Sequence, residues 1–272
     1  MGQAINVHPF DQAINLKAEA SGLFSGHTTD DYANMIGPFG GVSAAQALQA
    51  VWLNPNRLGE PISCTVNYLA PIAKGAFLIR AKAVRTNRST QHWWVEMLQA
   101  DKSVFSATVV TAVRRETWGN IEFKMPEVPD PEDCKSEVID FPVAWVNRYD
   151  MRPADSNSIS ISDPKGKDSN NLFWVKDVPS RTLDFPSLIA LCDVFLPRIY
   201  RRKVQRVAVG TISMMVNFHI SRIELEDLGP TYLLAQARGQ VFVNGFFDQV
   251  AQLWTRSGKL IATSQQLVYY KE

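Results

Sequence analysis

Apolar residues are distributed along the chain in short runs typical of strands and in two longer runs typical of buried helices. The first long run covers residues 42–53 and follows a loop that contains Gly40 and Gly41, and the second covers residues 185–196. Apolar stretches of this length that open after turn residues predict buried helices. The shorter runs are rich in Val, Ile, Phe and Trp and are separated by turns, which predicts antiparallel strands. These strands are expected at 62–69, 76–86, 92–100, 103–113, 148–153, 172–178, 209–220, 231–243, 246–256 and 259–270.

The order of one helix followed by strands occurs twice. Ser63 and Asn67 in the first half match Ser213 and Asn217 in the second half at the same spacing. Between the halves, residues 126–131 include three prolines next to acidic residues, a composition that favours neither helix nor strand. We therefore predict an N-terminal repeat over residues 1–120, a proline-rich linker over 121–140 and a C-terminal repeat over 141–272. A chance likeness between strands is the alternative.

The order of elements also predicts how they pack. An apolar helix that precedes a run of antiparallel strands favours a sheet curled around that helix, because the helix is apolar on too many faces to lie on a surface. This is the hot-dog arrangement. The predicted fold class is α+β, a double hot-dog in which two tandem antiparallel sheets, each wrapped around a central helix, form one continuous sheet with both helices on the same side.

Composition and charge exclude several classes of protein. The 272 residues are 46% hydrophobic and 20% charged, which suits a packed core and not a disordered chain. The formal net charge is +1 without a long basic run, so we expect neither nucleic acid nor an anionic membrane as a partner. No stretch reaches the roughly 18 apolar residues of a membrane span, and the N-terminus lacks the apolar centre of a secretion signal. These features favour a cytoplasmic location.

Residues with strong side-chain chemistry are sparse. The three cysteines, Cys64, Cys134 and Cys192, are far apart, and the four histidines show no metal-ligand spacing. Neither a metal site nor a disulfide framework is therefore expected. The Gly-x-Ser-x-Gly motif is absent, which disfavours a serine-nucleophile hydrolase of the α/β class.

Several short motifs together resemble the acyl-CoA thioesterase II-like family of double hot-dog proteins. They extend over nearly the whole chain, from about residue 22 to residue 270. The motifs are Phe39-Gly40-Gly41, Asn67 to Pro71, Asn87-Arg88-Ser89, Asp193 to Pro197, Thr211-Ile212, Phe218-His219 and Gly258 to Gln266. The resemblance implies hydrolysis of a thioester by direct attack of water, without a covalent acyl-enzyme and without a cofactor. The implied substrate is a small-molecule acyl thioester, bound to CoA or to a carrier.

In that family an Asp, a Thr and a Gln of the second repeat orient the attacking water, and they fall here on Asp193, Thr211 and Gln266. Asp193 lies in an otherwise apolar run, where an unpaired carboxylate costs several kcal/mol to bury. A functional carboxylate explains this position. The alternatives are a helix face open to solvent, or an ion pair with Arg198 or Arg201.

The repeat gives a second reason to select these positions. The first-repeat counterparts of Asp193 and Gln266 are Gln49 and Val110, so the charge of Asp193 and the polar side chain of Gln266 are specific to the second repeat. Gln265 and Gln266 are adjacent and strand alternation sends them to opposite faces, so only one lines a pocket. We choose Gln266 because it keeps the spacing from the turn at Gly258.

The predicted substrate-binding residues are Gly40, Gly41, Ser213 and Met215. Backbone N–H groups at the helix start near Gly40 and Gly41 are suited to hold the thioester oxygen. In bacterial relatives an Asp-His pair follows the matched Thr, whereas this chain has Ser213-Met214, which makes the pocket less polar.

We therefore expect a mostly apolar pocket. Its walls are predicted to include Met214 or Met215 together with Phe246 or Phe247, and flexible methionines adapt to different ligands. Such a pocket suits a fatty or polyketide-like acyl group.

Two further classes of function stay open on the sequence. A dry slot with one carboxylate also suits a hydratase, dehydratase or cyclase of specialised metabolism, and a non-catalytic acyl-binding protein is the third alternative. A homo-oligomer is expected, because exposed faces of hot-dog sheets commonly associate.

Overall fold

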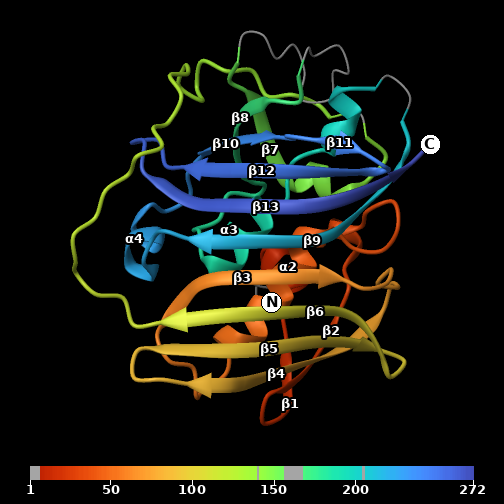
Figure 1. Cartoon of the computed structure of the whole chain (residues 1–272), viewed down its shortest axis with the longest axis vertical. Coiled ribbons are helices and arrows are strands. Elements are labelled where there is room, and N and C mark those ends of the chain that lie inside the picture. The colour runs from red at the N-terminus through yellow and green to blue at the C-terminus, as the bar shows by residue number, and fades with distance from the viewer. Residues whose placement is uncertain (1–6, 140, 156–167, 204–205) are drawn as a thin grey trace, which may run out of the picture.

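The computed structural model describes residues 7–139, 141–155, 168–203 and 206–272, and its strands form a single antiparallel sheet (Figure 1). The first half of the chain contains α1 (Pro9–Ala13), β1 (Lys17–Ala20), β2 (Leu23–His27), the 3-10 helix η1 (Asp30–Tyr32), α2 (Gly40–Trp52), β3 (Glu60–Tyr68), β4 (Ala76–Thr86), β5 (Thr90–Gln99) and β6 (Lys102–Ala112). The expected strands of this half are present. The pattern missed β1 and β2, and all four residues of β1 are exposed and show no apolar alternation.

The second half repeats this order with extra elements. It contains η2 (Ala144–Arg148), β7 (Tyr149–Pro153), β8 (Asn171–Asp177), α3 (Phe185–Leu191), η3 (Arg198–Arg201), β9 (Ala208–Phe218), α4 (Arg222–Asp227), β10 (Leu233–Arg238), β11 (Phe242–Val243), β12 (Phe246–Trp254) and β13 (Leu260–Lys271). Residues 113–143 connect the halves, and the part of this segment that the structure describes contains no helix or strand. The predicted boundaries at residues 120 and 140 stay a prediction.

Helix α2 is enclosed on nearly all sides. Ala44, Ala45, Ala47 and Ala50 are fully buried, and such small side chains allow neighbouring elements to approach the helix closely. Phe39, at the N-cap, makes no side-chain capping bond, and its carbonyl oxygen accepts from the N–H groups of Val42 and Ser43. This end of α2 borders the candidate site described below.

Helix α3 is shorter than its apolar run predicts. It begins with a capping box, in which Ser187 N donates to Asp184 Oδ1 at 2.8 Å and Ser187 Oγ accepts from Asp184 N at 2.9 Å. It ends at Leu191, whereas the sequence predicts a helix to residue 196. The difference arises because Phe195 and its neighbours belong to a buried loop, and apolar content alone does not separate a buried loop from a helix.

The two halves join through β3 and β9. The strand order is β1-β2-β4-β5-β6-β3-β9-β13-β12-β10-β8-β7, with β11 paired to β12. In the β3–β9 register, Ser63 pairs with Asn217 and Asn67 pairs with Ser213, so the matched residues of the two repeats exchange partners reciprocally. Thr65 pairs with Met215, its own counterpart. A pseudo-two-fold axis therefore passes through this pair, and the offset seen in the sequence is a structural repeat.

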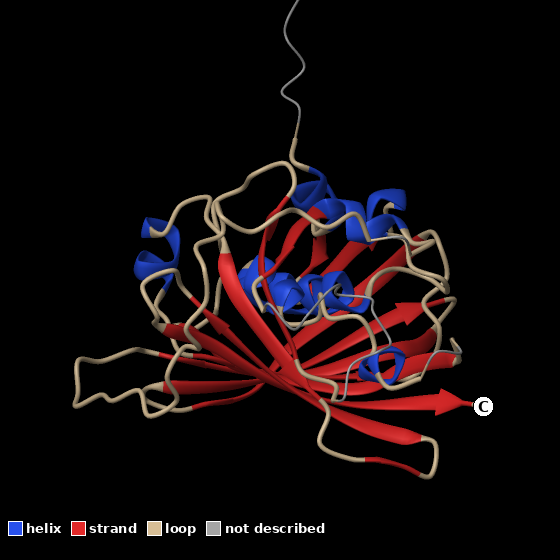
Figure 2. Cartoon of the chain, turned by 90° about the horizontal axis from the view of Figure 1, so that it is seen from above, coloured by secondary structure: helices blue, strands red, loops and turns tan. Residues whose placement is uncertain are grey.

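The helices gather on one side of the curved sheet, and α2 and α3 lie against each other there (Figure 2). The main core lies between these helices and the sheet, and it includes residues of both repeats. The predicted double hot-dog with one continuous sheet is confirmed.

Candidate active site

Asp193 lies just beyond the end of α3, in the loop that leads to Pro197. Its backbone N–H donates to Ala190 O at 3.0 Å, which holds the residue against the last turn of the helix. The carboxylate points across to the start of α2, where the Gly41 backbone N–H is a hydrogen-bond partner. A Cβ atom on Gly40 would lie 2.9 Å from Asp193 Oδ2. The absence of a side chain at residue 40 is therefore what lets the carboxylate approach this helix end.

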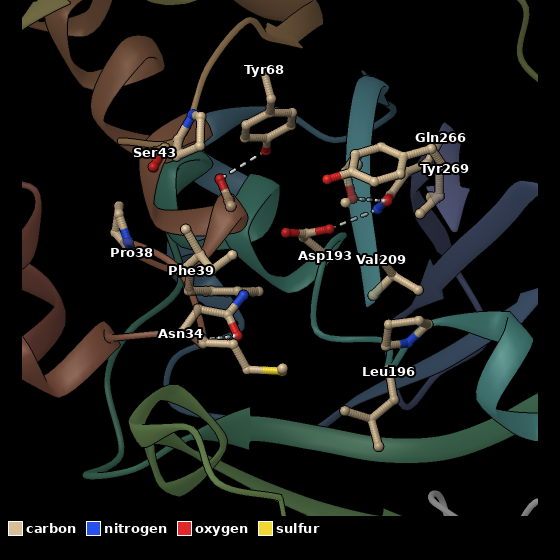
Figure 3. Close-up of a pocket in the computed structure, with 18 of the residues that line it drawn as sticks. Asn34, Pro38, Phe39, Ser43, Tyr68, Asp193, Leu196, Val209, Gln266 and Tyr269 are labelled. Atoms are coloured by element: carbon tan, nitrogen blue, oxygen red, sulfur yellow. Dashed lines mark hydrogen bonds between the residues drawn. The ribbon is translucent and has the colours of Figure 1, made fainter. Parts of the chain in front are cut away.

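Gln266 binds Asp193 from the sheet. Its Nε2 donates to Asp193 Oδ1 at 2.8 Å, and Figure 3 shows the two side chains pointing toward each other. Gln266 is 5% exposed and faces inward, whereas the adjacent Gln265 is exposed on the other face. Of the two neighbouring glutamines, it is thus Gln266 that the strand alternation of β13 directs to Asp193.

Thr211 reaches the same place through an irregularity in β9. Leu267 pairs with Ser213 but Val268 pairs with Thr211, so Ile212 is an extra residue in β9. This bulge shifts the alternation and turns Thr211 to the face that carries Gln266. Thr211 Oγ1 donates to Gln266 Oε1 at 3.4 Å, a long hydrogen bond. The structure therefore brings Asp193, Gln266 and Thr211 together in one chain of hydrogen bonds.

Burial raises the pKa of Asp193 to about 7, because the charged form loses its water. The hydrogen bonds from Gln266 and from the Gly41 backbone favour the charged form and partly offset this effect. No cationic side chain within the described ranges shifts this pKa or forms an ion pair with Asp193. Arg198, a predicted alternative partner, instead donates to the carbonyl oxygens of Leu196 and Ser169. A carboxyl with a pKa near neutrality is suited to accept and return a proton.

Tyr68 supports the first turn of α2 from β3. Its Oη donates to Gly40 O at 2.8 Å (Figure 3). Burial and the nearby charge of Asp193 raise the pKa of the phenol well above its ordinary value, so the hydroxyl stays protonated and able to donate. From the sequence, Tyr68 was noted only as part of the motif from Asn67 to Pro71, and no role was predicted for it.

A cavity of about 430 Å³ opens beside Asp193, Thr211 and Gln266. It lies between the repeats, because both supply its walls, and most of its lining side chains are apolar. The apolar lining residues include Met35, Ile36, Pro38, Phe39, Leu69, Ile72, Phe141, Trp145, Phe195, Leu196, Pro197, Tyr200, Val209, Phe247 and Val268. Gly40 also lines the cavity, as predicted for a residue near the thioester oxygen. Gly41 contributes through its N–H to Asp193.

Two predicted substrate-binding residues lie elsewhere. Ser213 and Met215 do not line the cavity, because the alternation of β9 places them on the face opposite Met214. Met215 is exposed there, and it pairs with the exposed Gln265. We therefore exclude Ser213 and Met215 from the proposed site.

Of the alternatives left open for the pocket wall, one phenylalanine lines the cavity and neither methionine does. Met214 is buried, and its Sδ lies 3.5 Å from Gln266 Nε2. Phe247 lines the cavity, whereas Phe246 is exposed. Sequence reasoning also missed Gln249, a buried polar residue of the cavity wall.

Other kinds of site find no support in the part of the chain that the structure describes. There, no three His, Cys, Asp or Glu side chains come together in a way that could hold a metal ion. No described helix is both long enough and apolar enough to cross a membrane. The three cysteines are free.

Comparison with known proteins agrees with the geometry. Residues 29–112 match the acyl-CoA thioesterase N-terminal domain, and residues 124–270 match the acyl-CoA thioesterase C-terminal domain. A comparison with curated protein sequences finds no match.

Solved structures share the fold over almost the full chain. A hot-dog protein of unknown function from Alicyclobacillus acidocaldarius is 40% identical, with a TM-score of 0.93 over 98% of this chain and 99% of the other. The acyl-CoA thioesterase II TesB2 from Mycobacterium marinum is 16% identical, with a TM-score of 0.77 over 96% and 98%. The TesB protein of Mycobacterium avium subspecies paratuberculosis is 18% identical, with a TM-score of 0.75 over 97% and 98%.

The fold and the interrepeat cavity define a double hot-dog protein. The chain belongs to the acyl-CoA thioesterase family and is a thioester hydrolase of that class.

Proposed function

We propose that this protein hydrolyses acyl-CoA thioesters by direct attack of a water molecule held by Asp193, Thr211 and Gln266. The observation that carries the proposal is the 2.8 Å hydrogen bond between Gln266 and Asp193 in a mostly apolar cavity at the start of α2. A carboxylate with neutral hydrogen-bond partners and no cation beside it keeps its basicity, which suits a general base.

The proton transfers balance around Asp193. The carboxylate accepts a proton from water while the water oxygen bonds to the thioester carbon. The C–S bond then breaks, and the thiol leaves with the proton that Asp193 held. Negative charge that develops on the carbonyl oxygen lies near the first turn of α2, where the Gly40 backbone N–H and the helix dipole stabilise it. Thr211 and Gln266 hold the water and the carboxylate in position for this proton transfer.

The cavity walls favour an apolar acyl group. Their Phe, Leu, Trp and Val side chains exclude water, which strengthens the electrostatic interactions of Asp193 with the reacting atoms. A volume of about 430 Å³ is within the range of small-molecule sites. A CoA or carrier-bound thioester as the substrate form, and a cytoplasmic location, belong to the proposal.

Release of free thiol from a panel of acyl-CoAs tests the proposal. We expect Asp193→Asn to lower kcat by at least about 10²-fold, because the amide keeps the shape and removes the basic charge. Asp227→Asn, on the exposed end of α4, is the matched control and should retain full activity. Full activity of Asp193→Asn in a folded protein would refute the role of this carboxylate.

A further inference from the structure

Gln249 is a polar side chain in the wall of the cavity that the proposed reaction does not use. Gln249 on β12 is 3% exposed and lines the cavity. It pairs with Gln266 across the β12–β13 ladder, so both side chains project to the same face. Phe247 and Val268 line the same wall. An amide is thus placed within an apolar surface, one strand away from the reacting groups.

The Gln249 amide has no hydrogen-bond partner within the described residues, in contrast to the other buried glutamines. Gln46 donates to Ala13 O at 2.7 Å, Gln91 donates to Asn56 O at 3.1 Å, and Gln266 binds Asp193. A buried amide without a partner loses its hydrogen bonds to water and gains none in return, which is unfavourable. Because the cavity borders Gln249, a ligand in the cavity is able to satisfy the amide.

We propose that Gln249 recognises an oxygen atom at carbon 3 of the acyl chain, so that the preferred substrates are 3-hydroxyacyl or 3-oxoacyl thioesters. This inference rests on the proposed thioesterase function. An amide donates to a keto oxygen and both donates to and accepts from a hydroxyl group, so one residue serves both substrates. Gln249 is a specificity-determining residue and takes no part in the proton transfers.

The position of the oxygen follows from the spacing of the strands. Neighbouring strands lie about 4.8 Å apart, and directly paired Cβ atoms lie about 5 Å apart. Gln266 marks the reacting end of the substrate through its bond to Asp193. A group within hydrogen-bond distance of the next side chain along the ladder is therefore a few bonds from the thioester carbon. Carbon 3 meets this condition.

The test compares matched acyl-CoAs of equal length, from 4 to 12 carbons, unsubstituted or with a 3-hydroxy group in either configuration or a 3-oxo group. For the wild-type protein, we expect kcat/KM to be at least tenfold higher for the best oxygenated member of a pair. A site built to hydrogen-bond a substrate group discriminates strongly against the analogue that lacks it. Equal or higher kcat/KM for the unsubstituted series would overturn the inference, since an ordered water would then satisfy Gln249.

Variants test whether the Gln249 amide causes the discrimination between oxygenated and unsubstituted substrates. Gln249→Leu should lower the ratio of kcat/KM for the oxygenated substrates to kcat/KM for the unsubstituted ones at least tenfold. Gln249→Met serves the same purpose if the Leu variant does not fold. Gln265→Leu, on the exposed face of the neighbouring strand, is the control and should keep the wild-type ratio. Unchanged discrimination in folded Gln249 variants would contradict the assignment.

A binding measurement separates this inference from the proposed reaction. The probes are ketone analogues of the hexanoyl-CoA and 3-hydroxyhexanoyl-CoA thioesters in which a CH₂ group replaces the sulfur, so that they are not hydrolysed. If no acyl-CoA is turned over, the proposed function fails, yet the Kd ratio of the two analogues still tests Gln249. We expect at least tenfold tighter binding of the hydroxylated analogue by the wild type, with loss of this preference in Gln249→Leu. Equal Kd values for the wild type would refute the inference.

Discussion

Gln266 Nε2 donates a hydrogen bond of 2.8 Å to Asp193 Oδ1, although 73 residues separate the two positions in the sequence. One residue lies on the last strand and the other follows α3, so the bond links the sheet to the loop after α3. It fixes the orientation of the carboxylate and favours its charged form. The predictions below depend on this arrangement.

Replacing Gln266 should change the pH dependence as well as the rate. Because its hydrogen bond lowers the pKa of Asp193, Gln266→Leu should raise that pKa and move the acid limb of kcat/KM to higher pH. We also expect a loss of about tenfold or more in kcat/KM at neutral pH. The measurement is the pH profile of thiol release, with Gln265→Leu as the control. An acid limb that stays in place would show that the bond does not act on the ionisation of Asp193.

Gly40 is predicted to be required for space. A Cβ atom there would lie 2.9 Å from Asp193 Oδ2 and 3.0 Å from Tyr68 Oη, so Gly40→Ala should displace the carboxylate and reduce kcat at least tenfold. Gly119→Ala is the matched control, since nothing lies within 4 Å of an added Cβ at that position. Equal activity of the two variants would contradict this view of the start of α2.

Two carboxyls with a raised pKa should make stability depend on pH. Burial raises the pKa of both Asp193 and Asp177 from 3.8 to about 7. Between about pH 4 and pH 7 the folded protein therefore holds protons that the unfolded chain has released, so these groups lower the free energy of unfolding as the pH rises. Above pH 7 the stabilisation that the protonated forms gave at low pH is lost.

A variant of Asp177 tests this effect on stability separately from catalysis, because Asp177 is not part of the proposed site. Both of its carboxylate oxygens lack a hydrogen-bond partner among the described residues. Asp177→Asn should be more stable than the wild type at pH 8, by on the order of a few kcal/mol, and the difference should shrink toward pH 4.5. Urea unfolding across this range measures it. If the wild type were as stable as Asp177→Asn at pH 8, or more stable, the charged form of Asp177 would have to be satisfied in the folded protein.

The predicted homo-oligomer has a candidate contact on the outer face of the sheet. One row of outward residues crosses the junction of the repeats, and its six central members are uncharged: Trp94, Thr108, Thr65, Met215, Gln265 and Val250. Lys82 and Arg238 follow at the two ends of this row. Light scattering should show a dimer or larger species, and Met215→Glu should shift the protein toward the monomer. A wild-type monomer at all concentrations would remove the prediction.

The sequence predicted the fold well because hydrophobic patterning records which elements are buried. The offset that matches Ser63 with Ser213 also describes the reciprocal β3–β9 pairing. Patterning did not reveal the end of α3, since the loop after Leu191 is as apolar as the helix. It also did not reveal the extra residue at Ile212, because a bulge leaves no apolar signal.

The register of β9 explains which site residues could be predicted from the sequence. Thr211 was selected through a family resemblance, and strict alternation from Met214 would have turned it away from Gln266. Conversely, Met215 was selected for its chemistry, and its register places it outside the cavity. Gln249 carries no motif, and only the absence of a partner in the folded protein distinguishes it from an ordinary strand glutamine.

The pH dependence of kcat/KM for the wild-type protein tests the central claim, that the ionised Asp193 activates water. Its pKa of about 7 predicts that kcat/KM falls roughly tenfold per unit below pH 7 and levels off above it, because only the carboxylate accepts a proton. A profile that stays flat from pH 5 to pH 9, or that rises as the pH falls, would contradict the claim.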